Sequence, residues 1–256
     1  MGVILRTEGL VKRFGGLIAT NHVNFELHDR EIKGLIGPNG AGKTTFYNLL
    51  TGVYKPDEGK VFFQGEDITG LPTNVICRKG LVRTYQITSI FPKVTVFENV
   101  RLSTQIGFSK SISPFFNIAH FASVTKQVDH ILELLGIESL RNRMAGEISQ
   151  GDQRLLEVAI ALGSNPKALI LDEPTAGLSA HETGQLAKKI RDLFDEGIIN
   201  SVVLVEHDID VVVGMAHTIC VLNYGEVIKD GPTMEVCDDP KVQEVYLCGG
   251  LKNVGS

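Results

Sequence analysis

Several features are scarce in this sequence of 256 residues: it has no tryptophan, four cysteines and no excess of basic side chains. Its 25 lysines and arginines are outnumbered by 30 acidic residues, and the net charge is −5. Because a nucleic-acid backbone is usually met by a clustered basic face, this balance argues against a nucleic-acid partner. The cysteines never form a C-x-x-C pair, so neither a zinc site nor a dithiol redox motif is indicated, and we expect them to be reduced and to pack. They are Cys77, Cys220, Cys237 and Cys248.

Long apolar runs are also missing. The first residues carry charges at Arg6 and Glu8 instead of the basic start and apolar stretch of a signal peptide, so we expect no export. The longest stretch without a charge lies between Lys110 and Lys126, is interrupted by Pro114, and is shorter than the roughly 20 apolar residues of a membrane-spanning helix. We therefore expect that the chain itself does not cross a membrane.

The hydrophobic pattern favours an α/β fold. Apolar runs that end in Gly or Pro alternate with longer helical patterns, which is typical of layered α/β proteins. Val23–Leu27 and Lys60–Phe63 alternate between apolar and polar residues, which predicts an antiparallel sheet region. Short apolar runs predict strands buried on both faces at Ile32–Ile36, Ala168–Leu171 and Ser201–Val205. The predicted architecture is a mixed-sheet core with an antiparallel β lobe.

A phosphate-binding loop follows the first of these buried strands. The motif G-x-x-x-x-G-K-[ST] starts at Gly37, and a helical pattern ending near Gly52 comes after it, so strand, loop and helix stand in the required order. The glycines let backbone N–H groups point inward at phosphates, and the helix adds its positive end. We expect Lys43 to meet the β- and γ-phosphates and Thr44 to ligate Mg²⁺. The nucleotide-binding candidates of this loop are Gly37, Asn39, Gly40, Gly42, Lys43, Thr44 and Thr45.

A second acidic element lies at the end of the strand ALILDEP, where two carboxylates leave the sheet at the edge that usually binds ligands. We expect Asp172 to hold Mg²⁺ through water. Glu173 is then the candidate for orienting or deprotonating the attacking water.

The chain also carries Ser149-Gln150-Gly151 at the start of a predicted helix, shortly before that strand. Together with the phosphate loop and the Asp-Glu strand, this element resembles the signature motif of ATP-binding cassette (ABC) ATPases. The resemblance implies that Ser149 and the backbone of Gly151 contact the γ-phosphate of an ATP held by the opposite chain. This copy departs from the family's usual Leu-Ser-Gly-Gly-Gln at Gln150 and Asp152, and Ser179 stands where the D-loop of the family commonly has Asp. Coupling between the two ATP sites is therefore expected to differ in strength.

The same resemblance implies further site residues. Phe14 matches the aromatic residue that stacks on adenine. Gln86 matches the Q-loop glutamine, which contacts the metal and relays occupancy to the membrane partner. His207 matches the switch histidine, which senses the γ-phosphate and helps to position Glu173. The implied catalytic residues are thus Glu173, His207 and Gln86, and the implied metal residues are Thr44, Gln86 and Asp172.

The resemblance covers nearly the whole chain and implies one ABC ATPase domain over residues 1–256. It divides into an ATP-binding core, at about 1–86 and 166–256, and a helical subdomain at about 87–165. Since the chain has only one phosphate loop and one signature element, a working enzyme needs two chains arranged head to tail. The second chain can be an identical copy or a related ATPase.

Finer features resemble the ATPases of branched-chain amino acid importers. They are the segment RFGGL at 13–17, the segment LVRTYQ at 81–86, a Phe-rich insertion near 105–125 and the ending VQEVYL at 242–247. This likeness implies amino-acid uptake with membrane permeases and a substrate-binding protein, and a peripheral place on the cytoplasmic face of the inner or plasma membrane. ATPases of urea uptake and of lipopolysaccharide extraction share the ending, although the latter generally have a shorter helical lobe.

Two other classes fit less well. A soluble P-loop kinase would use Lys43 and Asp172 but has no need of Ser149, Gly151 or His207. A soluble ABC protein that acts on ribosomes or DNA typically carries two cassettes or long coiled-coil insertions, and neither feature is in the sequence.

Overall fold

The computed structural model describes residues 2–84, 90–108 and 118–247, whereas residues 1, 85–89, 109–117 and 248–256 lie outside the described part. The chain forms two compact units. The first consists of Met1–Ile76 and Asn200–Ser256, and the second of Cys77–Ile199.

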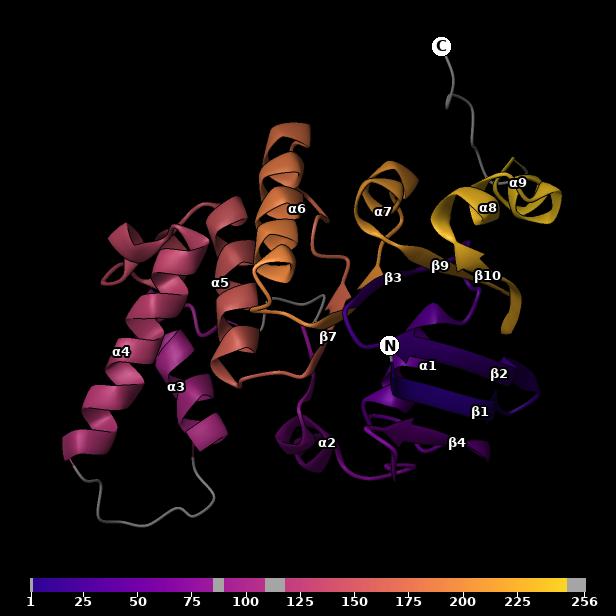
Figure 1. Ribbon diagram of the computed structural model, residues 1–256, viewed down its shortest axis with the longest axis horizontal. Helices are drawn as coiled ribbons and strands as arrows, with labels where there is room; N and C mark the ends of the chain where they lie inside the picture. The colour runs from indigo at the N-terminus through magenta and orange to yellow at the C-terminus, as the bar shows by residue number, and fades with distance from the viewer. Residues whose placement is uncertain (1, 85–89, 109–117, 248–256) are drawn as a thin grey trace. The chain divides into compact units, whose positions relative to one another are not determined.

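An antiparallel sheet forms one part of the first unit (Figure 1). Its strands, in the order β2-β1-β4-β5, are β2 (Leu17–His28), β1 (Val3–Phe14), β4 (Glu58–Phe63) and β5 (Glu66–Asp67). In β2, Val23, Phe25 and Leu27 are buried whereas Asn24 and Glu26 are exposed. The alternation therefore predicted both the strand and its buried face correctly.

The other strands of the first unit follow the order β10-β9-β3-β8. β3 (Glu31–Ile36) runs parallel to β8 (Ser201–Val205) and to β9 (Thr218–Asn223), and β10 (Glu226–Pro232) returns antiparallel to β9. Every residue of β3 and β8 is buried, as predicted for strands covered on both faces. The helices α1 (Lys43–Leu50), α7 (Ile209–Met215), α8 (Thr233–Cys237) and α9 (Pro240–Leu247) belong to this unit, and α2 (Thr73–Lys79) crosses its boundary.

The second unit contains two parallel strands, β6 (Leu81–Arg83) and β7 (Ala168–Asp172), and the helices from α3 to α6. α3 (Val96–Phe108), α4 (Ile118–Leu135) and α5 (Gln150–Gly163) lie side by side (Figure 1). Short 3₁₀ turns at Glu138–Leu140 and Ala145–Glu147 connect α4 to α5, and α6 (Ala180–Asp195) follows β7. The predicted partition into a core and a helical subdomain at about 87–165 concerns functional lobes rather than these two units, and it stays a prediction.

Two expectations from the composition can be compared with the structure. Cys77, Cys220 and Cys237 are free thiols, as expected, while Cys248 lies outside the described residues. Burial raises the pKa of all three described thiols, which keeps them protonated. Within the described ranges, no helix is both long and apolar enough to span a membrane.

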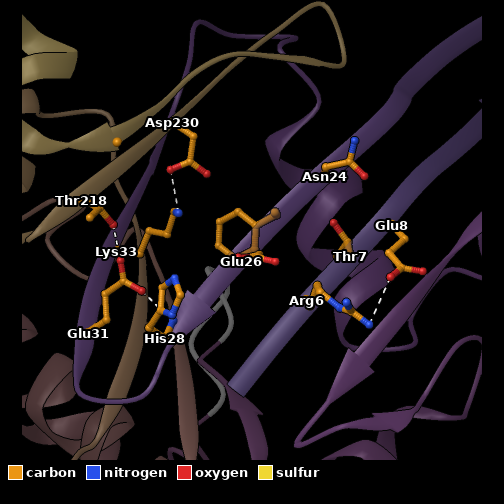
Figure 2. Close-up of a pocket in the computed structure, with 12 residues that line it drawn as sticks. Arg6, Thr7, Glu8, Asn24, Glu26, His28, Glu31, Lys33, Thr218 and Asp230 are labelled. Atoms are coloured by element: carbon orange, nitrogen blue, oxygen red, sulfur yellow. Dashed lines mark hydrogen bonds and ion pairs between the residues drawn. The ribbon is translucent and has the colours of Figure 1, made fainter. Parts of the chain in front are cut away.

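A polar pocket in the first unit lies where the antiparallel sheet faces the start of β3 (Figure 2). At its side, the buried Lys33 ammonium forms an ion pair with Asp230 at 2.7 Å and lies 5.0 Å from the centre of the Phe25 ring. Glu31 accepts hydrogen bonds from the Thr218 hydroxyl and from the backbone N–H of His28. The pocket opens near the amino end of β3, whereas the phosphate loop leaves its carboxyl end, so the two are separate features of this unit.

Candidate nucleotide site

The loop between β3 and α1 is built around glycines that no other residue type replaces easily. Gly42 is the N-cap of α1 and has a positive φ of 99°, and a Cβ added there would come within 2.3 Å of the Ala19 carbonyl oxygen. Gly40 also has a positive φ, of 81°, but a Cβ there would meet nothing within 4 Å. Gly42 therefore lets the loop pack closely against β2, whereas Gly40 borders open space that a phosphate group can enter.

Lys43 is the best-defined side chain of this loop. It is 7% exposed, and its ammonium donates to the carbonyl oxygens of Gly37 and, at 3.2 Å, of Pro38. Those carbonyls hold the charge inside the loop, at the amino end of α1. The Thr44 hydroxyl is exposed next to it and accepts a hydrogen bond from Tyr47 at 3.1 Å.

Other parts of the first unit support the loop. The backbone N–H of Gly225, in the turn between β9 and β10, donates to the Ala41 carbonyl at 2.9 Å. Burial raises the pKa of the Tyr246 hydroxyl on α9 above its usual range, while the nearby backbone of Gly37 lowers that pKa in part. The ending VQEVYL thus packs its tyrosine against the first glycine of the loop.

Phe14 and His207 belong to the same unit as the loop. Phe14 ends β1, is 43% exposed, and meets the edge of Tyr54 with 5.4 Å between ring centres. An exposed ring at this place can stack on a base. His207 is exposed and follows β8 at the same sheet edge as the loop, because Leu35 of β3 pairs with Val205 of β8 in parallel register.

The acidic pair lies in the second unit, at the carboxyl end of β7. Asp172 is buried, and its Oδ2 forms an ion pair with the Arg83 guanidinium at 2.7 Å. Its Oδ1 is buried and has no hydrogen-bond partner among the described residues. A partly unsatisfied buried carboxylate suits a water ligand of Mg²⁺, so Asp172 and the exposed Thr44 hydroxyl have the oxygen chemistry that this ion prefers.

Glu173 has an unusual backbone. Its φ of 47° lies in the left-handed region, which costs a residue with a side chain about 1 kcal/mol or more. The backbone N–H of Ala176 donates to the Glu173 carbonyl at 3.1 Å, which closes a turn directly after the strand. This turn directs the chain away from β7 immediately after the two carboxylates.

The signature element begins α5 as predicted. Ser149 is the N-cap residue, and its hydroxyl accepts from the backbone N–H of Asp152 at 3.1 Å and donates to the Asp152 carboxylate at 2.7 Å. Asp152 therefore lies in the first turn, where the helix dipole favours a negative charge. Gln150 packs against the D-loop segment, since a Cβ on Gly177 would come within 2.5 Å of its side-chain nitrogen. Ser179, the other departure from the family pattern, is the N-cap of α6 in a capping box with Glu182.

The predicted site residues thus fall into two groups. The first unit holds the phosphate loop, Phe14 and His207, and the second holds Asp172, Glu173 and the signature residues. Gln86 lies outside the described residues. Sequence reasoning missed the ion pair of Arg83 with Asp172, although a charged residue at the end of a buried strand, three positions before Gln86, was a signal for it.

Comparisons with known proteins agree with this geometry. Residues 20–176 match the family model described as ABC transporter. The chain is 38% identical to the high-affinity branched-chain amino acid transport ATP-binding protein BraF of Pseudomonas aeruginosa and 39% identical to LivG, of the same description, from Escherichia coli K12. In both cases 95% of this chain and 97% of the relative are covered. A crystal structure of the ADP conformation of MJ1267, an ATP-binding cassette of an ABC transporter, superposes with a TM-score of 0.84 at 32% identity, covering 96% of this chain and 99% of that one.

Proposed function

The chain belongs to the ABC transporter family as an ATP-hydrolysing subunit, and from that premise we propose that it powers a membrane importer of branched-chain amino acids. The observation that carries the proposal is the similarity, along almost the full chain, to BraF and LivG, which are named for that transport. The segments RFGGL, LVRTYQ and VQEVYL support the same subfamily.

We propose that the phosphate loop holds the triphosphate of ATP through its backbone N–H groups. Lys43 then exchanges the carbonyls of Gly37 and Pro38 for the β- and γ-phosphates. Phe14 stacks on the adenine, and its exposure supports this role. The remaining loop residues proposed for ATP are Gly37, Asn39, Gly40, Gly42, Thr44 and Thr45.

The proposed metal residues are Thr44, Asp172 and Gln86. Mg²⁺, when bound, neutralises charge that develops on the β- and γ-phosphate oxygens. Within the described part of the chain, Oδ1 of Asp172 has no hydrogen-bond partner, which supports its assignment because a buried carboxylate oxygen is satisfied by a water or by a cation. Glu173 orients the attacking water, and His207 detects the γ-phosphate and helps to place that water.

ATPases of this family work as dimers with membrane permeases. We propose that Ser149 and the backbone of Gly151 contact the ATP of the opposite chain, so each site is complete only in the dimer. The second chain is either a copy of this one or a related ATPase. The assembly lies on the cytoplasmic face of the inner or plasma membrane and receives its substrate from a binding protein. The closed dimer binds ATP more tightly than the open dimer does, and this difference in affinity drives closure.

We propose that the segment after Gln86 forms part of the groove that receives a coupling helix of the permease. Phe91 supports this proposal, because its side chain is 59% exposed although its backbone is fixed by two hydrogen bonds to the buried Asn99 side chain, at 2.7 and 3.1 Å. A rigidly held, exposed aromatic ring suits a protein interface. If Phe91→Glu and Ile90→Glu leave transport and permease association intact, this part of the proposal is wrong.

The substrate is tested by uptake in cells that lack this chain. The cells are complemented with the native sequence or with an empty vector, and uptake of labelled leucine and of labelled urea is measured separately. Restoration of leucine uptake alone supports the proposal. Restoration of urea uptake alone indicates a urea importer, and a response confined to cell-envelope integrity indicates a lipopolysaccharide-type exporter.

A further inference from the structure

We propose that Arg83 is a positioning residue for the metal-holding carboxylate. Its guanidinium occupies Oδ2 of Asp172, so that only Oδ1 is left to face the metal and its waters. The inference rests on the proposed role of Asp172 and adds a residue that this role requires.

The contact is buried and well defined. The Arg83 and Asp172 side chains are 8% and 0% exposed, and the guanidinium nitrogen lies 2.7 Å from Oδ2. Separating a buried ion pair leaves an uncompensated buried charge, which strongly destabilises the folded protein. The two side chains are therefore expected to stay in contact. The two oxygens of Asp172 are therefore unequal: Oδ2 is bound to Arg83, while Oδ1 has no partner within the described structure.

The backbone around the pair fixes its register. Arg83 pairs with Ile170 in the parallel ladder of β6 and β7. The next residue, Thr84, donates its backbone N–H to the Ile170 carbonyl at 3.0 Å, and its hydroxyl accepts from the backbone N–H of Asp172 at 3.2 Å. Three successive contacts thus tie the end of β6 to the end of β7.

This arrangement has a consequence for the metal. Groups that hold a metal ligand from behind typically contribute about 10- to 100-fold to metal affinity, because they orient the ligand and fix its charge. Without Arg83, the Asp172 carboxylate is free to rotate, and Oδ1 no longer has a set direction. Arg83 also lies three positions before Gln86, so it anchors the strand that leads to a second proposed metal residue.

The chain offers a matched control in the same unit. Arg154 and Glu157 on α5 form another buried ion pair at 2.9 Å, with side chains 9% and 6% exposed, and Glu157 likewise has one oxygen without a partner among the described residues. Burial raises the pKa of Glu157, with Arg154 opposing that shift. Arg154 also donates to the Ala176 carbonyl at 3.2 Å. Since neither Glu157 nor Ala176 is proposed to hold a metal, Arg154→Met reproduces the loss of a buried arginine without the loss of a metal-positioning group.

The test compares metal affinity among the native chain, Arg83→Met, Arg83→Lys, Arg154→Met and Asp172→Asn. Binding of Mn²⁺ in the presence of ATP is followed by electron paramagnetic resonance, and binding of a fluorescent ATP analogue is titrated with and without Mg²⁺. We expect Arg83→Met to weaken Mn²⁺ binding about 10- to 100-fold, as a lost orienting partner does, while metal-free nucleotide binding changes little. Arg83→Lys retains the charge and should fall between Arg83→Met and the native chain, whereas Arg154→Met should stay within about twofold of native.

Each outcome has one meaning. If folded Arg83→Met binds Mn²⁺ as tightly as the native chain, or more tightly, the pair is structural or competes with the metal, and the proposal is overturned. If Arg83→Met does not fold, Arg83→Lys decides: unchanged Mn²⁺ affinity in that variant overturns the proposal, and a clear loss supports it. If Asp172→Asn binds Mn²⁺ like the native chain, it is the proposed metal role of Asp172 that fails.

Discussion

Replacing either of two glycines in the phosphate loop with alanine should produce two different defects. Ala at position 42 must adopt a φ of 99° and place its Cβ 2.3 Å from the Ala19 carbonyl oxygen, a separation that real Cβ atoms essentially never show. Ala at position 40 adopts a φ of 81° but meets nothing within 4 Å. Gly42→Ala is thus opposed by both backbone strain and a collision, whereas Gly40→Ala is opposed by strain alone.

The expected magnitudes follow from these two terms. A side chain in the left-handed region costs about 1–2 kcal/mol, of which about 0.4–1 kcal/mol is recovered because the unfolded chain loses freedom. Gly40→Ala should therefore lower the free energy of unfolding by about 1 kcal/mol. The backbone collision adds about 1–3 kcal/mol at position 42, as overpacking does, so Gly42→Ala should lose about 2–4 kcal/mol.

Urea unfolding and ATP titration distinguish the two variants. Gly42→Ala should show the larger fall in the unfolding midpoint. Gly40→Ala should remain folded but bind ATP more weakly, because its Cβ enters the space proposed for a phosphate. Equal stability of the two variants would refute the steric argument, and native ATP affinity in Gly40→Ala would refute the placement of the phosphate.

Three further predictions concern contacts elsewhere in the chain. Lys33→Met should lower the free energy of unfolding by about 2–3 kcal/mol, which is less than for a fully buried ion pair because Asp230 is 31% exposed (Figure 2). In urea unfolding, the additional change Asp230→Asn should restore most of that loss. A double variant that is no more stable than Lys33→Met would contradict the ion pair. The Ser179 hydroxyl and then its backbone N–H lower the pKa of Glu182, so the stability from this cap is present above the ordinary pKa of Glu and is lost as the pH falls through the lower, folded value. The difference in melting temperature between the native chain and Glu182→Gln should accordingly shrink between about pH 7 and pH 3, and a constant difference would argue against the cap. Ser149→Ala should lower the free energy of unfolding by about 1 kcal/mol, whereas Ser149→Asn should retain the helix cap. Both variants should lose ATP hydrolysis. Full hydrolysis by Ser149→Asn would mean that Ser149 only caps the helix.

Local motifs explain most of what the sequence could predict. The phosphate loop, the cap at Ser149 and the alternation in Val23–Leu27 each depend on residues close together in the chain, and the structure has them as expected. β3 was predicted as a buried apolar strand although it contains Lys33, and the structure shows why this lysine is tolerated: its charge is paired with Asp230, far along the chain.

The contacts that could not be predicted join distant segments. Arg83 and Asp172 are 89 positions apart, and nothing in either segment alone specifies that they pair. The contact between Gln150 and Gly177 likewise depends on how α5 packs beside the D-loop segment. This contact joins Gln150, where the signature element departs from the family pattern, to Gly177 near Ser179. Comparing each motif with the family separately does not show that the two positions touch.

Hydrolysis at Glu173 is proposed to drive amino-acid uptake. Right-side-out membrane vesicles are prepared from cells that carry either the native chain or Glu173→Gln, loaded with ATP and supplied with the proposed substrate-binding protein, so that leucine accumulation can be measured directly. Native vesicles should accumulate labelled leucine only when they contain ATP. Glu173→Gln vesicles should accumulate none, although the variant binds ATP as tightly as the native chain. Equal accumulation by both kinds of vesicle would show that uptake does not depend on hydrolysis at Glu173.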